Sequence, residues 1–377
     1  MNNLEKLLSP ARKVLWDVSG AFGDIGVLFP LAVALIAKNH MNPTALFLMA
    51  GLFYVLSAGY FKITMPVQPL KAMSAIAIAS GLSVGVINAA GIIMGFVLLL
   101  LALTGVSARL GEIFPVPVIR GIQLGLGAML VRTSFGLIRP DLFIAIAAGV
   151  MLVAATLFLK KVPPLIPLLA FGLILSLKHA ALPSLSLPVF TVALPGLDEL
   201  RTGLVALVLP QLALTFGNAI VATNDTGRLL YREKAGRLNL KSIPLSMGLA
   251  NIVSGFAGGA PMCHGCGGLT AHNKFGATSG RSGLIIGFTL IVFGLFCGHS
   301  AVAVVSAFPA GILGVLLCYV GIQHALYLQD IMKDATAVTI ALIVGVLGFV
   351  LNNLTLGFLA GLAIYYGLSG IKKMASA

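Results

Sequence analysis

Long apolar segments separated by short polar turns run along almost the whole chain. They predict about fourteen membrane-spanning segments, some of them short, because a helix needs roughly 20 mostly apolar residues to cross the hydrocarbon core. The expected spans begin near Phe22, Pro43, Gln68, Gly85, Pro115, Asp141, Val162, Gly203, Ile243, Cys263, Gly283, Phe308, Ala335 and Leu354. The pattern therefore predicts an all-α membrane protein.

The composition excludes a soluble protein of ordinary size. Hydrophobic residues make up 59% of the 377 positions, charged residues make up 9%, and the mean hydropathy is +1.05. The formal net charge of +13 would indicate nucleic acid as the partner of a soluble protein, but the basic residues lie mostly in short gaps between apolar segments. That distribution is typical of topology signals, so we expect the lipid bilayer as a partner and no nucleic acid.

The basic residues also predict an orientation. If the N-terminus is cytoplasmic, they should precede the first span and follow each even-numbered span, and most of them do. The residues expected on the outer side are Lys38, Arg132, Arg139, Lys178 and Arg201. We expect a multi-pass protein of the cell (inner) membrane with both termini in the cytoplasm. Trp16 would anchor an amphipathic helix at the membrane surface.

Three short sequence matches, each with its members 194 or 195 residues apart, indicate an internal repeat. They are Phe22-Gly23-Asp24 with Phe216-Gly217-Asn218, Phe114-Pro115 with Phe308-Pro309, and Pro66 with Pro261. Two copies of about seven spans would be inverted relative to each other, a recurrent architecture of secondary transporters. The predicted organisation is a cytoplasmic or interfacial segment (1–19), a first seven-span repeat (20–200) and a second (201–373), without a separate soluble domain.

The third and tenth expected spans are interrupted by proline, glycine and polar residues. The interruptions are Thr64–Lys71 (TMPVQPLK) and Ala260–Gly268 (APMCHGCGG). Each predicts an extended segment followed by a half-helix, a geometry tolerated in a membrane only where protein or a water-filled cavity satisfies the backbone. The N-termini of two half-helices from opposite repeats would converge on one point, which favours an anion.

Four segments carry a family resemblance. They are FGDIGVLFPLAVAL in span one, PVQPLKAMSAIAIASG in span three, LPQLALTFGNAIVATNDTG in span eight and PMCHGCGGLTAHNKFGATSG in span ten. Together they resemble the molybdate transporter family, a branch of the sulfate permease superfamily, from about Trp16 to the C-terminus. The resemblance implies a core-and-gate fold with substrate between spans one, three, eight and ten, and relatives commonly form homodimers. Sulfate permeases usually carry a C-terminal regulatory domain, and the few residues after Lys373 favour the molybdate branch.

The residues expected to bind substrate lie in the broken spans and in span eight. They are Gln68, Lys71, Asn218, Cys263, His264, Gly265 and Cys266. The Gln68 amide would donate to an oxyanion oxygen, and Lys71 would attract a dianion as a point charge. In the alternative interpretation Gln68 caps neighbouring backbone and Lys71 neutralises Asp24. Asn218 stands where the first repeat has Asp24, so the second repeat keeps only hydrogen bonding.

The sequence Cys263-His264-Gly265-Cys266 has the Cys-x-x-Cys spacing of zinc and redox sites. No second Cys or His pair is near enough in the sequence to complete a tetrahedral site, so we expect no metal and no cofactor. The glycines suit close approach of backbone to a ligand. His264 is expected to act as a hydrogen-bond donor or proton carrier. The alternative is a packed histidine bonded to a carbonyl.

Three residues are candidates for coupling transport to protons, namely Asp24, His264 and Asp225. Asp24 is the only acid in its span, and an intramembrane carboxylate is costly enough to indicate a function. Its alternative role is that of a structural partner for Lys71. Asp225 lies near the cytoplasmic end of span eight, where a solvated helix terminus is the competing explanation.

Some polar and small residues have simpler explanations. Arg120, at the start of span five, would extend to the membrane interface. Several glycines of spans four and five most simply permit close helix packing. These glycines are Gly91, Gly95, Gly121, Gly125 and Gly127.

The sequence thus predicts a secondary active transporter that imports a tetrahedral oxyanion, molybdate first and sulfate second, by proton symport and alternating access. A Walker motif is absent, and so are the HExxH and GxSxG motifs of enzymes. Import of a dianion against an inside-negative membrane costs roughly 4.6 kcal/mol per 100 mV, so a driving ion is needed. A sulfate or bicarbonate exchanger, a nucleobase symporter and an anion channel remain as alternatives.

Overall fold

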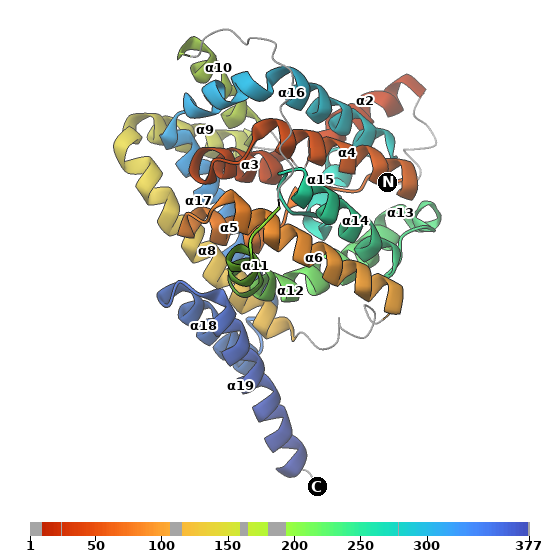
Figure 1. Ribbon diagram of the computed structural model, residues 1–377, viewed down its shortest axis with the longest axis vertical. Coiled ribbons are helices and arrows are strands. Elements are labelled where there is room, and N and C mark those ends of the chain that lie inside the picture. Colours follow the sequence, from red (N-terminus) through yellow and green to blue (C-terminus); the bar gives the residue numbers. More distant parts are fainter. Residues whose placement is uncertain are drawn as a thin grey trace.

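The computed structural model describes residues 10–23, 25–105, 115–158, 165–179, 194–277 and 279–375, and most of them are helical (Figure 1). The first half contains α2 (Pro10–Ala21), α3 (Ile25–Asn39), α4 (Pro43–Phe61), β1 (Gln68–Pro69), α5 (Lys71–Ser80), α6 (Val84–Thr104), α8 (Val116–Ile138), η1 (Arg139–Asp141), α9 (Leu142–Phe158) and α10 (Leu165–His179). The second half begins with a nearly continuous helix made of α11 (Leu197–Thr202), η2 (Gly203–Val208), α12 (Leu209–Leu214), η3 (Thr215–Ala222) and α13 (Thr223–Tyr231). It continues with η4 (Arg232–Ala235), α14 (Ser242–Phe256), β2 (Met262–Cys263), α15 (Cys266–Lys274), α16 (Arg281–Ser306), α17 (Ala310–Leu326), η5 (Tyr327–Ile331), α18 (Ala335–Val350) and α19 (Leu354–Ala375).

Several helices are long and apolar enough to cross a membrane. In the described part of the chain these are Pro43–Phe61, Val84–Thr104, Val116–Phe158 and Ala310–Ile331. A fifth results if Leu197–Leu214 and Asn218–Ala235 form one bent span. Further apolar helices are shorter, with 10–17 residues. The chain is therefore a mostly helical, multi-pass membrane protein, whereas the total of about fourteen spans stays a prediction.

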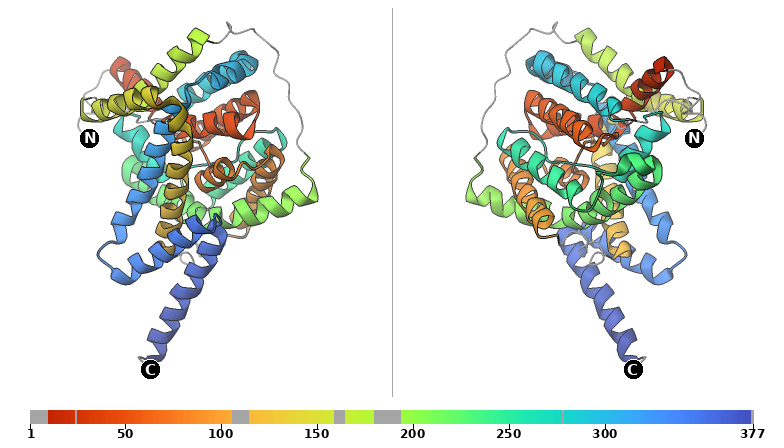
Figure 2. Two further views of the ribbon diagram at one scale, coloured as in Figure 1. Left: turned by 90° about the vertical axis from the view of Figure 1, so that its left-hand side faces the viewer. Right: turned by 90° about the vertical axis from the view of Figure 1, so that its right-hand side faces the viewer.

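Large apolar side chains cover the outside of many helices. Phe143 and Phe158 on α9 are 91% and 80% exposed, and Leu100 on α6 is 63% exposed. Such a surface is unfavourable in water and is expected against lipid tails. Helix α19 projects away from the other helices at the C-terminal end of the chain (Figure 2). Its exposed leucines, such as Leu359, extend the apolar surface onto it.

The two broken spans meet through a short antiparallel strand pair. Gln68 of β1 lies opposite Cys263 of β2, and the Leu70 amide donates to the Pro261 carbonyl at 2.8 Å. Half-helix α5 follows β1 after one residue, and α15 follows β2 after two residues. These elements confirm the prediction of an extended segment followed by a half-helix in both places.

Side chains of α14 satisfy backbone groups that the strand pair leaves over. Asn251 is fully buried, accepts a hydrogen bond from the Met262 amide at 2.6 Å and donates to the Met262 carbonyl at 2.8 Å. Ser254 donates to the Ala260 carbonyl at 2.8 Å. Asn251 thus bonds β2 as a neighbouring strand would, and a buried backbone group without such a partner would be costly.

In the described part of the chain, several pairs of helices cross at points where glycine faces glycine. Among them are Gly51 of α4 with Gly287 of α16, Gly95 of α6 with Gly248 of α14, and Gly127 of α8 with Gly321 of α17. A Cβ atom on Gly95 would lie 2.9 Å from the Gly248 carbonyl oxygen, closer than side chains pack. The crossings confirm that glycines of spans four and five permit close helix packing.

A buried carboxylate attaches the N-terminal helix α2 to the start of α16. Asp17 is 1% exposed and accepts hydrogen bonds from the hydroxyl groups of Ser279 at 2.7 Å and Ser282 at 3.0 Å. Trp16 beside it is 42% exposed, which suits a residue at a membrane surface. The cytoplasmic location of the segment stays a prediction.

Replacement of Gly95 by leucine should destabilise the protein, because the new side chain would have to displace the backbone of α14. We expect a loss of about 1–3 kcal/mol, the usual cost of overpacking, and a lower melting temperature of the purified protein in detergent. Gly149→Leu on α9 is the control, since no atom lies within 4 Å of a Cβ placed there. Equal melting temperatures for the two variants would contradict a tight α6–α14 crossing.

Candidate functional site

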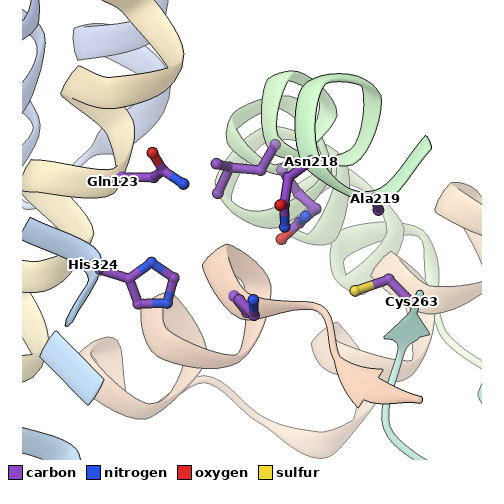
Figure 3. Close-up of a pocket in the computed structure, with 8 residues that line it drawn as sticks. Gln123, Asn218, Ala219, Cys263 and His324 are labelled. Atoms are coloured by element: carbon purple, nitrogen blue, oxygen red, sulfur yellow. The ribbon is translucent and has the colours of Figure 1, made fainter. Parts of the chain in front are cut away.

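A pocket lies between two groups of helices. Its lining residues are Lys71, Gln123, Gln211, Leu214, Asn218, Ala219, Cys263 and His324. Figure 3 shows Gln123 of α8 and His324 of α17 on one side, facing Asn218, Ala219 and Cys263 on the other. We call Gln123 and His324 the α8–α17 wall. The half-helix wall consists of the other six lining residues, namely Lys71, Gln211, Leu214, Asn218, Ala219 and Cys263.

The chemistry of the lining suits an anion. The amide side chains of Gln123, Gln211 and Asn218 and the imidazole of His324 carry N–H donors, and Lys71 adds a positive charge. Among the described residues that line the pocket, none is a carboxylate. Donors around a cation favour a small ion with several acceptor oxygens.

Lys71 is the first residue of half-helix α5 and supplies positive charge to the pocket. Its ammonium group interacts electrostatically with His324 on the α8–α17 wall and with Cys266 at the start of α15. This position agrees with a role in substrate binding, which stays a prediction. Asp24, the alternative partner that the sequence offers for Lys71, lies outside the described residues.

Gly265 brings two predicted ligand residues close to the start of α15. A Cβ atom on Gly265 would lie 3.5 Å from Oε1 of Gln68 and 3.8 Å from Nδ2 of Asn218. Gln68 itself is completely buried on β1. The structure therefore gathers these three residues at one point, beside the pocket that Asn218 lines, and glycine keeps that point accessible to the two amides.

Cys266 orients the Asn218 side chain. Its thiol donates to Oδ1 of Asn218 at 2.7 Å, so the nitrogen Nδ2 is left as the group that can donate to a ligand. The sulfur also lies against the backbone N–H groups of Cys266 and Gly267 at the start of α15. Cys263 lines the pocket, whereas Cys266 acts on it through Asn218. In the described ranges no group of three His, Cys, Asp or Glu side chains is arranged to hold a metal ion.

The N-terminus of α5 is occupied by the side chain of Gln211, which was not predicted from the sequence. Oε1 of Gln211 accepts hydrogen bonds from the amides of Ala72 at 2.9 Å and Met73 at 3.2 Å. Nε2 of Gln211 donates to the Thr215 hydroxyl at 3.1 Å. The expectation that these half-helix N–H groups point at a ligand is therefore wrong for Ala72 and Met73 in this conformation.

His264 lies in a packed environment rather than in the pocket lining. Its Nδ1 is 2.8 Å from the Pro66 carbonyl and its Nε2 is 3.2 Å from the Ser246 hydroxyl. The ring is fully buried between Phe53 and Phe61 of α4. This geometry agrees with the alternative of a packed histidine bonded to a carbonyl. Direct contact of His264 with substrate or protons stays a prediction without support from this arrangement.

Asp225, another coupling candidate, is also away from the pocket lining. Asp225 on α13 is exposed, and its carboxylate accepts a hydrogen bond from Asn224 at 3.1 Å. An exposed position at a helix start is the solvated terminus that the sequence offers as the competing explanation. Asp24 lies outside the described residues, so its role stays a prediction.

Three polar residues that line the pocket were not predicted from the sequence: Gln123, Gln211 and His324. Each is at most 5% exposed. Each is also a polar residue within an otherwise apolar segment, the signal that indicates a functional position inside a membrane. Arg120 needs a correction too. It does not simply extend to the interface, because it pairs with Asp330 at 2.6 Å and donates to Gln123 at 3.0 Å.

The arrangement of helices defines the class of protein. The structure is similar to the transmembrane domain of BicA, a cyanobacterial bicarbonate transporter, with a TM-score of 0.65 and 19% identity, covering 92% of this chain and 97% of that chain. It is also similar to SLC26A9, with a TM-score of 0.69 and 13% identity, covering 97% of this chain and 67% of that chain. At these identities the likeness establishes a membrane transporter fold of the BicA and SLC26 type.

The sequence comparison defines the family within that class. A family model described as "Molybdate transporter of MFS superfamily" matches residues 17–130 and 203–323, and this chain belongs to that molybdate transporter family. Molybdate transporter 2 of Arabidopsis thaliana is 27% identical over 93% of this chain and 86% of its own length. Molybdate transporter 1 of Chlamydomonas reinhardtii is 25% identical over 96% of this chain and 93% of its own length.

These results confirm the resemblance carried by the four span motifs. The family description names the MFS superfamily, whereas the fold is of the BicA and SLC26 type. The relatives are transporters, in agreement with a protein that is not an enzyme.

His264→Ala should destabilise the protein, because it removes a buried ring and leaves the Pro66 carbonyl without this partner. We expect a loss of at least about 2 kcal/mol, measured as a lower melting temperature in detergent. Gln323→Ala, at an exposed position of α17, is the control. An unchanged melting temperature for His264→Ala would contradict the packed interpretation and favour the functional one.

Proposed function

We propose that this protein is a secondary active transporter that imports a tetrahedral oxyanion, with molybdate as the first candidate. Membership of the molybdate transporter family supports the proposal, and so do the relatives named molybdate transporters in Arabidopsis thaliana and Chlamydomonas reinhardtii. The observation that carries it is the pocket, in which one lysine and several buried amides face a common space. Sulfate and bicarbonate are the comparison substrates, since a bicarbonate transporter shares the fold.

Each residue that the sequence predicts to bind substrate has a definite task in this proposal. Lys71 supplies the positive charge that a dianion requires. Asn218, oriented by Cys266, donates from Nδ2, and Gln68 lies beside it. Cys263 and Gly265 leave room for the anion to approach the strand pair. His264 contributes indirectly, by bonding the Pro66 carbonyl and so supporting β1.

The proposed architecture is two inverted repeats of about seven spans, 20–200 and 201–373. The strand register supports it. Gln68 and Cys263 lie opposite each other and are 195 residues apart, the same spacing as Pro66 and Pro261. An antiparallel pair centred on equivalent positions is the geometry that a two-fold axis between repeats produces.

The extensive helix contacts support the same relation. Helix α4 packs on α16, which pairs the second expected span with the eleventh. Helix α6 packs on α14, which pairs the fourth with the ninth. A two-fold rotation that exchanges the repeats places the second span on the ninth and the eleventh on the fourth. It therefore converts one helix pair into the other. Alternating access then follows from rocking of the core spans, one to four and eight to eleven, against the remaining gate spans.

Proton symport supplies the driving force in this proposal. A dianion moving inward against 100 mV requires roughly 4.6 kcal/mol, which co-transported protons can offset. Asp24 is the proposed proton-binding residue, because it is the one acid of its span. The protein is proposed to lie in the cell (inner) membrane with both termini in the cytoplasm, and to be able to form a homodimer.

The binding proposal is tested by isothermal titration of the purified protein with molybdate, tungstate, sulfate, bicarbonate and uracil. We expect molybdate to bind most tightly, and Lys71→Met to weaken it at least about tenfold, because a charge-assisted hydrogen bond contributes roughly 1.5–3 kcal/mol. Lys38→Met is the control, since Lys38 is an exposed lysine at the end of α3.

Two outcomes would contradict this proposal. Binding of sulfate, bicarbonate or uracil in preference to molybdate would keep the fold and overturn the substrate. An equal effect of Lys71→Met and Lys38→Met would remove Lys71 from the site.

The coupling proposal is tested by uptake of molybdate into proteoliposomes under an imposed pH gradient. We expect an acidic exterior to accelerate uptake by the wild type. Asp24→Asn should abolish the acceleration while molybdate binding persists, because the asparagine side chain cannot carry the proton. Uptake that does not respond to the gradient would contradict proton symport, and flux that fails to saturate would indicate a channel.

A further inference from the structure

His324 is a buried histidine in the pocket with an unused hydrogen-bonding atom. It is 5% exposed, and its Nδ1 has no hydrogen-bond partner among the described residues. Figure 3 shows its ring pointing from α17 into the space opposite Asn218. A buried polar atom without a partner is unfavourable, so this position needs an explanation. The second segment matched by the family model ends at residue 323, immediately before it.

Gln123 lies on the same wall, and a network behind it fixes its orientation. Nη1 of Arg120 donates to Oε1 of Gln123 at 3.0 Å, and Nη2 donates to Asp330 at 2.6 Å. The Arg120 guanidinium also lies over the Tyr327 ring, 5.4 Å from its centroid. Because the oxygen of the Gln123 amide faces Arg120, the nitrogen is the atom left for the pocket.

We propose that His324 is a direct substrate contact, donating a hydrogen bond from Nδ1 to one oxygen of the bound oxyanion, with Gln123 as a second donor on the same wall. Arg120 is a positioning residue that acts through Gln123. This inference rests on the proposed function and adds the α8–α17 wall to it. The family resemblance indicates substrate between spans one, three, eight and ten, whereas His324 belongs to the twelfth expected span.

The shape and charge of the anion explain why a second wall is needed. The oxygens of a tetrahedral ion point in four directions, and the half-helix wall can reach only those that face it. An oxygen pointing to the opposite wall would be buried without a donor unless that wall supplied one. The positive charge of Lys71 acts across the pocket as far as His324, so an anion between them is attracted by Lys71, while the neutral imidazole of His324 offers a hydrogen bond. The site is then complete only while the two walls are together.

The test compares two substitutions of similar size, His324→Asn and His324→Leu. Asparagine places an amide nitrogen close to the position of Nδ1, whereas leucine fills the space without a donor. Isothermal titration with molybdate should give an affinity within about threefold of the wild type for His324→Asn and at least about tenfold weaker for His324→Leu. Gln323→Leu, one position away and exposed, should bind molybdate as the wild type does.

The outcomes separate this inference from the proposed function. A wild-type protein that binds no oxyanion would overturn the proposed function, and with it this inference. Wild-type binding with an unaffected His324→Leu, or with equal losses for asparagine and leucine, would overturn the His324 contact alone. If melting temperatures show that His324→Leu does not fold, Gln123→Leu is measured in the same way, and unchanged affinity there would overturn the second wall.

Discussion

A backbone N–H or C=O group inside the bilayer has no water to bind, so it must find its partner in the protein. In this chain the constraint is strongest around β1 and β2, where proline and glycine prevent a continuous helix. The strand pair satisfies some of these groups, Asn251 satisfies both backbone groups of Met262, and His264 lies against the Pro66 carbonyl. The strand pair and the His264 bond join segments far apart in the sequence, so the helices that carry these segments must pack closely.

Close packing is what the facing glycines provide, and it explains how the pocket acquires its shape. Where Gly95 meets Gly248, α6 and α14 approach nearly backbone to backbone, so α6 lies directly against the helix whose Asn251 bonds β2. The strand pair in turn sets the starting points of α5 and α15, and therefore the positions of Lys71 and Cys266. The pocket is thus a consequence of how the broken spans satisfy their backbone. Lys71 adds charge to that framework, and Gln123 and Asn218 add amide groups.

The amino-acid sequence predicted the features that depend on local chemistry. Prolines in Thr64–Lys71 exclude a helix wherever the chain goes, and closely spaced glycines permit close helix packing. It could not predict which side chain would satisfy a given backbone group, because such partners are separated by many residues. Gln211 lies 139 positions from the Ala72 amide that it binds, and His264 lies 198 positions from Pro66. For the same reason the sequence left two roles open for Asp225, and it did not single out His324 near the end of an apolar helix.

The hydrogen bonds of Gln211 limit which groups of the pocket can hold an anion. Its carbonyl oxygen already accepts from two amides of α5, and its nitrogen donates to Thr215, so displacing it would break three hydrogen bonds at once. An anion that left Gln211 in place would have to rely on Lys71 and on side-chain donors from both walls. Donors on opposite walls separate when the walls move, whereas backbone donors of one half-helix would not. A ligand held by both walls therefore binds more tightly when the walls are close together than when they are apart. Only such a difference in affinity lets a substrate shift the balance between two conformations.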